Sequence, residues 1–404
     1  MKKTSKWTVW ATCALVVIGP ACATGGDDGV TTDDGVPSFR VSGGTVPTYE
    51  PDPLHFSLLP DLWTNGPVGG VAVDSHDHVW VHHRPGTIQA SAVGAANDPP
   101  TADCCVPAPP VLEFDPDGRF VRAWGGPSDE YEWFASEHGI YVDSRDNVWL
   151  TGSAAQDNHI LKFTSSGRFL LQIGRAGMNQ GSNDTANLGG PADLFLHEPT
   201  SELFVADGYV NRRVIVFDAD TGAYKRHWGA YGNRPDDTAE LPSRAEYVAQ
   251  LARGDSPPQQ FHTPVHTVHV ARDGMVYVGD RSHLRIQVFD LDGTFVREVF
   301  IRSGTLDGVG TVHELATSPD PEETFLYVVD GANSWIHILE RETMRVVSRV
   351  GGRKGHNARE FFHLHSFATD SNGNLIIGEV NNGQRFYRWR FTGMGAPSNT
   401  ELPP

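Results

Sequence analysis

The chain has 404 residues and a formal net charge of −18 at pH 7. An acidic balance of this size opposes contact with phosphate backbones and anionic lipids, so we expect neither nucleic acid nor anionic membrane as a partner. After the first 23 residues, no apolar run is long enough to span a bilayer.

The N-terminal segment 1–23 has the pattern of a secretory signal peptide, with three lysines before a short apolar run. Ala21-Cys22-Ala23 fits a cleavage site after Ala23, and the alternative is that Cys22 becomes a lipidated N-terminus. Segment 24–36 is a Gly/Asp/Thr-rich tether that we predict to be disordered. We therefore expect an exported protein of the periplasm, cell envelope or extracellular space. We also expect it to be a monomer.

Residues 37–395 contain six similar units, followed by a tail at 396–404. Each unit pairs two segments of alternating apolar and polar residues around Asp/Asn/Gly turns, which predicts four short antiparallel strands. In chain order the paired segments are 69–83 with 111–125, 138–152 with 159–174, 192–207 with 213–229, 266–280 with 285–299, 313–330 with 335–351, and 365–379 with 386–391. Such units predict an all-β fold, a six-bladed β-propeller of NHL-like repeats. The last unit ends after three strands, so we expect an N-terminal strand, with 38–43 as the candidate, to complete it.

Two connecting segments differ from ordinary turns. Segment 232–260, between the third and fourth units, is long enough to be a lid or a recognition loop. Cys104 and Cys105 are adjacent, and form either a vicinal disulfide or two thiols in a loop. The other two cysteines belong to the leader, and no C-x-x-C pair exists, which disfavours zinc on cysteine.

Histidine is enriched at the residue just before the first strand of each unit. In chain order the six positions hold Gly69, His138, Ala192, His266, His313 and His365. Histidine makes up 18 of 404 residues, so six positions hold one histidine or none by chance, and here they hold four. His138, His266 and His365 lie in alternate blades, and therefore about 120° apart around a central channel.

Three imidazoles that converge and leave a fourth direction open have the layout of a catalytic zinc site. The alternative is a ring of channel histidines hydrogen-bonded to water or to carbonyl groups. His313 breaks the threefold pattern. We interpret it as a channel filler rather than as a supporting base or a substrate contact.

Tyr209 stands in a turn where Gly, Asn or Ser would serve equally well. It comes two residues after Asp207, at the end of the second strand of blade 3, and Arg84 comes one residue after the corresponding strand end in blade 1. Facing one histidine triangle, the guanidinium suggests anion binding and the phenol suggests proton transfer. Taken singly, Tyr209 is better explained by rim packing and Arg84 by a surface ion pair.

From about residue 66 to 392, these motifs resemble those of the peptidyl-α-hydroxyglycine α-amidating lyases, in the same order. "HGIYVD", "PVHTVHV" and "LHSFAT" are similar to the segments that each supply one zinc histidine in that family. "GVAVDS…HHR" is similar to the segment with the substrate-binding arginine, and "ADGYVNRRVIVF" to the one with the catalytic tyrosine.

The resemblance implies zinc on His138, His266 and His365, with Arg84 as substrate anchor and Tyr209 as general base. It also implies a lyase that cleaves a C-terminal α-hydroxyglycine of a peptide into a peptide amide and glyoxylate.

The chain departs from the family at several positions. Ser366 stands where the family has an aspartate that helps hold a structural calcium. The carbonyl groups of Val71 and Ile140 would remain, but losing the carboxylate argues against calcium. His363 replaces a methionine, and Val210 replaces a cysteine of a disulfide. We expect no hydroxylating copper domain, so the precursor would come from elsewhere. Secondary candidates for contact with substrate or for support of the site are Asp207, Asn211, His313 and His363.

Two other functional classes stay open. An NHL-type propeller also serves as a non-catalytic binding module for peptide or glycan, because fold does not determine function. A metal-dependent hydrolase or lactonase would use the metal to activate water, although propellers of that kind usually hold calcium through oxygen ligands. Three histidines accept several divalent metals, so the residues alone leave the metal open.

Overall fold

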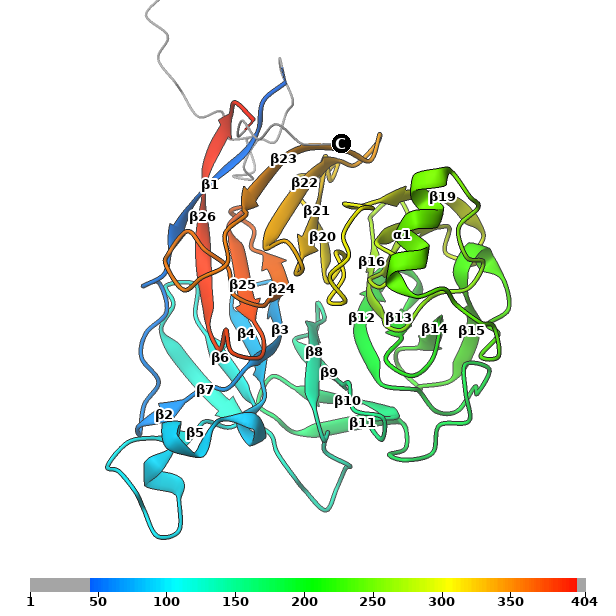
Figure 1. Cartoon of the computed structure of the whole chain (residues 1–404). Helices are drawn as coiled ribbons and strands as arrows, with labels where there is room; N and C mark the ends of the chain where they lie inside the picture. The colour runs from blue at the N-terminus through cyan, green and yellow to red at the C-terminus, as the bar shows by residue number, and fades with distance from the viewer. Residues whose placement is uncertain (1–43, 398–404) are drawn as a thin grey trace, which may run out of the picture. The chain divides into compact units, whose positions relative to one another are not determined.

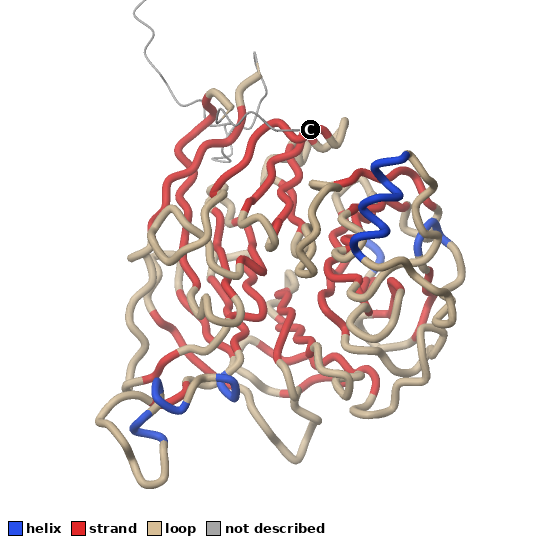
Figure 2. Tube along the Cα trace, in the orientation of Figure 1, coloured by secondary structure: helices blue, strands red, loops and turns tan. Residues whose placement is uncertain are grey.

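The computed structural model describes residues 44–397, all within the compact unit Thr31–Pro404. Strands account for most of the regular structure, as the red segments of Figure 2 show. They form six antiparallel sheets of four strands, which are the six blades of a β-propeller (Figure 1). The repeats therefore predicted the fold class correctly.

The first five blades follow the chain from the inner strand to the outer strand. Blade 1 consists of β3 (Val68–Val73), β4 (Val79–His83), β6 (Val111–Phe114) and β7 (Phe120–Trp124). Blade 2 consists of β8 (Glu137–Val142), β9 (Asn147–Gly152), β10 (His159–Thr164) and β11 (Phe169–Gly174). Blade 3 consists of β12 (Pro191–His197), β13 (Glu202–Asp207), β14 (Arg213–Asp218) and β15 (Tyr224–Trp228). Blade 4 consists of β16 (Val265–Val270), β17 (Val276–Asp280), β18 (Arg285–Phe289) and β19 (Phe295–Phe300). Blade 5 consists of β20 (Leu315–Thr317), β21 (Phe325–Asp330), β22 (Trp335–Glu340) and β23 (Arg345–Gly351).

Blade 6 is completed by a strand from the other end of the chain. It consists of β24 (Leu364–Thr369), β25 (Leu375–Glu379), β26 (Phe386–Gly395) and β1 (Val46–Asp52). The register of β1 on β26 is antiparallel, from Val46 opposite Gly395 to Asp52 opposite Arg388. The predicted closing segment 38–43 lies outside the described residues, and β1 is the strand that closes the ring.

Aspartate side chains form the tight turns between many of the strands. Asp74 Oδ1 accepts from the backbone N–H groups of His76 and His78, and Asp143 Oδ1 accepts in the same way from Arg145 and Asn147. Asp370 repeats the pattern between the first two strands of blade 6, and Asp290 repeats it between the last two strands of blade 4. An aspartate that satisfies two turn amides explains why Asp recurs in the turns of these blades.

The hydrophobic core is divided into six clusters, one between each pair of neighbouring blades. In β9, Val148 and Leu150 face blade 1 while Trp149 faces blade 3, because successive side chains of a strand point to opposite faces. The inner strands also contact one another in order, and β24 contacts β3. Each blade therefore needs both neighbours to bury its two faces.

The connections contain the helical segments. The 232–260 segment, treated above as a loop, contains α1 (Arg244–Arg253), which begins at a capping box between Ser243 and Glu246. Short 3₁₀ turns occur at Pro85–Thr87, Ala90–Ala92, Gly94–Ala96, Glu198–Thr200 and Ala230–Gly232, and β2 (Trp63–Thr64) pairs with β5 (Val106–Pro107). Cys104 and Cys105 form a vicinal disulfide. Among residues 44–397, no helix has the length and apolar character needed to cross a membrane.

Candidate metal centre and cleft

The three alternate-blade histidines occupy equivalent positions at the start of inner strands. His138, His266 and His365 are each the second residue of their strand, in β8, β16 and β24. In all three strands the pairing register shifts at this point. A bulge re-aims a side chain out of the regular ladder, which allows the imidazoles to leave the blade interface.

The three imidazoles converge on one place. One nitrogen from each ring lies within 4.8 Å of the corresponding nitrogen of the other two. The ring centroid of His138 lies 5.0 Å from that of His266 and 4.7 Å from that of His365. The centroids of His266 and His365 lie 4.9 Å apart. Spacings of this size fit a single metal ion bound by all three rings.

The next blade fixes the tautomer of each ring. Nδ1 of His138 lies 2.7 Å from the Ala192 carbonyl, Nδ1 of His266 lies 2.6 Å from the His313 carbonyl, and Nδ1 of His365 lies 2.9 Å from the Gly69 carbonyl. A carbonyl only accepts, so each Nδ1 carries the hydrogen and each Nε2 keeps its lone pair. The equivalent positions in the other three blades thus supply the carbonyls that orient the three imidazoles.

Burial keeps the three histidines neutral. Their exposed fractions are 2%, 1% and 4% for His138, His266 and His365. Burial lowers the pKa of His365 to about 3 and holds the pKa values of His138 and His266 well below the ordinary value. Neutral imidazoles with inward-facing Nε2 lone pairs are ready metal ligands, and the residues fit a bound divalent ion.

Tyr209 brings a phenol to the same nitrogens. Its hydroxyl lies 2.9 Å from Nε2 of His138 and 3.2 Å from Nε2 of His266. Because both nitrogens are acceptors, the hydroxyl donates its single hydrogen to one of them at a time. The preceding Gly208 permits this approach, because a Cβ there would lie 2.0 Å from the Val265 carbonyl oxygen.

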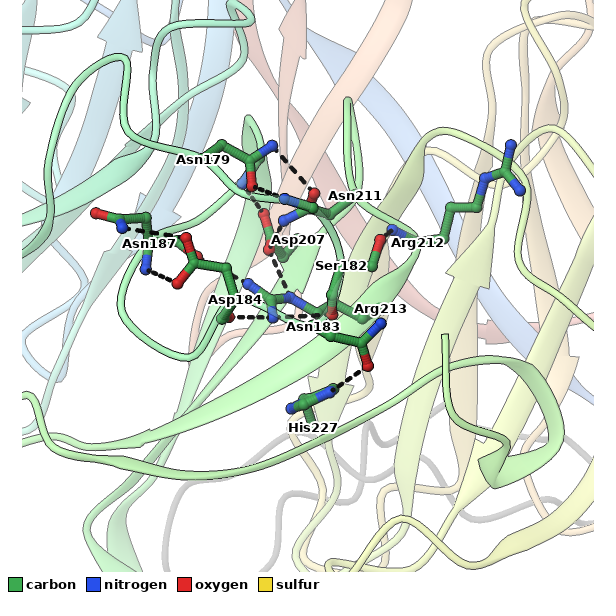
Figure 3. Close-up of polar contacts among 12 residues, drawn as sticks. Asn179, Ser182, Asn183, Asp184, Asn187, Asp207, Asn211, Arg212, Arg213 and His227 are labelled. Atoms are coloured by element: carbon green, nitrogen blue, oxygen red, sulfur yellow. Dashed lines mark hydrogen bonds and ion pairs between the residues drawn. The ribbon is translucent and has the colours of Figure 1, made fainter. Parts of the chain in front are cut away.

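A buried polar network holds the turn that carries Tyr209 (Figure 3). Asp207 accepts from the backbone N–H of Gly189 at 2.6 Å and from the Asn211 side-chain amide at 2.8 Å. It also forms an ion pair of 2.8 Å with Arg213, and both side chains are fully buried. Asp207 and Asn211, named above as candidates for substrate contact or support, lie under the turn and support it.

A cleft of about 390 Å³ opens over the centre. Its lining comes from several blades and includes Arg84, Tyr209, Arg281, His313, His363 and His365. Arg84 donates from Nε to the Glu137 carbonyl at 2.7 Å, next to His138. Burial lowers the pKa of Arg84, and the neighbouring Tyr209 opposes this shift. No residue of 232–260 lines this cleft.

Arg281 is the cleft residue that the sequence analysis missed. Its guanidinium carbon lies 5.7 Å from the Tyr209 ring centroid, and its buried Nε has no hydrogen-bond partner among the described residues. Arg281 follows the last residue of β17 as Arg84 follows the last residue of β4. Aligning the ends of the second strands would have found it, three blades from Arg84.

The other family departures leave different signatures. His363 lines the cleft with φ +58°, a conformation that is strained for a side chain of this size. Ser366 is 2% exposed, and its hydroxyl has no hydrogen-bond partner among residues 44–397. It supplies no carboxylate, so the residues do not fit the calcium site that would use Val71 and Ile140.

Comparison of the sequence with those of known proteins finds distant relatives. The mouse peptidyl-glycine alpha-amidating monooxygenase is 27% identical over 248 residues, which cover 58% of this chain and 22% of the relative. The Drosophila melanogaster peptidyl-alpha-hydroxyglycine alpha-amidating lyase 1 is 25% identical over 66% of this chain and 48% of its own length. The chain is a distant relative of the α-hydroxyglycine amidating lyases.

The same comparison also finds a relative named without an enzyme activity. Human NHL repeat-containing protein 3 is 29% identical over 191 residues, covering 46% of each chain. No family model matches the chain. The alignments span less than half the length of all three relatives, so the activities and substrates of those proteins are proposals for this chain.

Proposed function

We propose that this chain is a zinc-dependent lyase that cleaves the C–N bond of an N-acyl α-hydroxyglycine or of a peptide ending in that group. The products would be an amide and glyoxylate. The observation that carries the proposal is the Tyr209 hydroxyl between two inward-facing Nε2 atoms, under a cleft that also contains two guanidiniums.

His138, His266 and His365 would hold the metal through Nε2. When bound there, zinc would act as a Lewis acid and lower the pKa of an oxygen bound to it. Three histidine ligands leave a position for such an oxygen, as in catalytic rather than structural zinc sites.

The side chains of the cleft would bind the substrate by its charges. Arg84 and Arg281 present planar guanidiniums, which match the two oxygens of a carboxylate. The cleft lining contains three cationic side chains, the two arginines and Lys354, and one carboxylate, Asp307. This local excess of positive charge in a chain with net charge −18 favours an anionic substrate group over a neutral one.

Tyr209 would handle the proton. As a phenolate it would take the proton of the α-hydroxyl, whose oxygen then forms the carbonyl of glyoxylate. The C–N bond breaks, its electron pair remains on the amide nitrogen, and that nitrogen takes up one proton. No water is consumed. The positive charges of Arg84 and of a bound metal would stabilise the negative charge on the Tyr209 oxygen.

Elemental analysis and product assay test the proposal together. We expect about one zinc per chain after purification without chelator, and loss of zinc in a His138→Ala, His266→Ala, His365→Ala variant. The zinc-loaded protein should release glyoxylate from N-acyl α-hydroxyglycines, together with an amide that carries no ¹⁸O from labelled water. Release of a carboxylic acid that carries ¹⁸O, in place of the amide, would point to a hydrolase and overturn the lyase.

A binding module for peptide is the second candidate. The similarity to NHL repeat-containing protein 3 favours it. Such a protein would bind an acylated peptide by calorimetry with equal affinity in the wild type and a Tyr209→Phe variant, and would release no glyoxylate.

Export, a leader at 1–23 and a lipid anchor on Cys22 stay predictions, because those residues lie outside the described part of the chain.

A further inference from the structure

The imidazole of His313 has no use in orienting the metal centre. His313 orients His266 through its backbone carbonyl, as Gly69 and Ala192 orient the other two ligands. Gly69 has no side chain and Ala192 only a methyl group, so this role needs no imidazole. The interpretation of His313 as a filler leaves the choice of a polar ring unexplained.

The fold makes room for this ring at the cleft. The His313 ring lies 5.2 Å from the ring of His266 and 5.9 Å from that of His365, and it lines the cleft. At Gly331 a Cβ would lie 2.6 Å from Cε1 of His313, so the ring occupies the space that a side chain at 331 would need. An imidazole seated against bare backbone has a restricted orientation.

Backbone contact also sets its tautomer. The N–H of Gly331 donates to Nδ1 of His313 at 3.4 Å, so the ring hydrogen is on Nε2. Among the described residues, no hydrogen bond uses that Nε2–H. Because Nδ1 accepts a hydrogen bond, it carries no hydrogen, and Nε2–H is the one donor of a neutral ring.

We propose that Nε2–H of His313 donates a hydrogen bond to the acyl carbonyl oxygen of the substrate and stabilises the departing amide. This inference rests on the proposed function. As the C–N bond breaks, its electron pair moves to nitrogen and is shared with the acyl oxygen, and the proton lost by the α-hydroxyl ends on that nitrogen. A fixed neutral donor suits an oxygen that begins neutral and gains charge only in the transition state.

The remaining cleft groups have other partners in this assignment. Arg84 and Arg281 are matched to the carboxylate, and Tyr209 to the α-hydroxyl. The acyl oxygen is the third polar group of the minimal substrate. The lining also includes Lys354, which lies 4.0 Å from Asp307, and the side chains of His363 and Asn381. Among these remaining donors of the described residues, we choose His313 because its ring lies against the rings of two proposed metal ligands, His266 and His365.

The test uses the zinc-loaded wild type with His313→Ala, His313→Gln and, as control, His76→Ala, which removes an exposed imidazole. The substrates are N-benzoyl α-hydroxyglycines whose ring substituents vary the pKa of the departing amide. We expect His313→Ala to lower kcat about 10²- to 10³-fold, as for loss of one donor to a developing oxyanion. Its kcat should also depend more steeply on the amide pKa, and His313→Gln, which keeps an N–H donor, should recover part of the loss.

The possible failures differ in what they overturn. If a plot of log kcat against the pKa of the departing amide has the same slope in His313→Ala as in the wild type, the donor role is refuted while the lyase stands. If the fall in kcat matches a loss of zinc measured in the same samples, His313 supports the metal, and the donor role is again refuted. A wild type that releases no glyoxylate from any substrate of the series overturns the proposed function and the assignment of His313 with it.

Calorimetry with N-benzoylglycine, which lacks the hydroxyl, gives a readout besides turnover. Unchanged affinity in His313→Ala together with unchanged kcat rejects any contact.

Discussion

Replacing Arg213 with methionine tests whether the network in Figure 3 holds the Tyr209 turn. Arg213 and Asp207 are both fully buried, with Nε and Oδ2 2.8 Å apart. The guanidinium also donates to the carbonyl groups of Ser182, Asp184 and Asn187, which lie in the connection between β11 and β12. Methionine retains much of the side-chain bulk and removes all of these bonds.

The expected loss of stability is large. Removing one partner of a buried ion pair leaves an uncompensated charge and costs about 3–5 kcal/mol. The Ser182 carbonyl is buried, so losing its donor adds to this cost. The bonds to the Asp184 and Asn187 carbonyls are only partly buried, and we add nothing for them. Against a free energy of unfolding of about 5–15 kcal/mol for an ordinary domain, this is a substantial share.

Urea denaturation followed by tryptophan fluorescence measures the change. The matched control is Arg145→Met, which breaks an ion pair with Asp220 whose side chains are 51% and 52% exposed, and should cost no more than about 1 kcal/mol. The double variant Asp207→Asn, Arg213→Met should be more stable than Arg213→Met alone, because no charge remains unpaired. A loss in Arg213→Met no greater than in Arg145→Met would refute the reasoning.

The other predictions concern the site and pH. Tyr209→Phe should lower kcat by about 10²- to 10⁴-fold while zinc content by elemental analysis stays at the wild-type level; lost zinc would make Tyr209 a structural residue. Arg281→Lys keeps the charge but not the fork geometry, so it should raise KM in the glyoxylate assay, and an unchanged KM would remove Arg281 from carboxylate binding. Burial lowers the pKa of His82 and of His269 to about 3, below the ordinary value of 6.5. Their contribution to stability is therefore present above pH 6.5 and is lost as pH falls toward 3. Between about pH 4 and pH 6, each histidine should remove about 1.4 kcal/mol of the free energy of unfolding per pH unit of acidification. Tm of the metal-free protein should fall accordingly. A Tm equally pH-dependent in a His82→Gln, His269→Gln variant would contradict this assignment.

The sequence predicted those features that repeat. Alternating apolar residues and aspartate turns recur in each blade, so the propeller was visible without coordinates. The histidine triangle was found for the same reason, since His138, His266 and His365 occupy one position of the repeat. Whether they converge depended on the bulges in the inner strands, which no local pattern shows.

The missed features depend on contacts between distant segments. Arg281 belongs with Arg84 only when the ends of the second strands are aligned, and a single arginine after a strand has no distinguishing pattern. The role of Asp207 under the Tyr209 turn depends on the backbone N–H of Gly189 and on Arg213, which the sequence alone does not place beside it. Helix α1 did carry a local signal, the capping box Ser243–Glu246, which the polar residues around it obscured.

The pairing of β1 with β26 has a consequence for how the metal centre is made. His365 lies in the blade that this pairing completes, so the third ligand and the closing strand come from opposite ends of the chain. A ribosome that has released only five blades has made two of the three ligands, and neither is yet enclosed. Metal capture would thus coincide with the meeting of the two chain ends. A metal bound by all three histidines would therefore be acquired only when the ring closes, and proteolytic trimming past Val46 would loosen the ring and the metal site together.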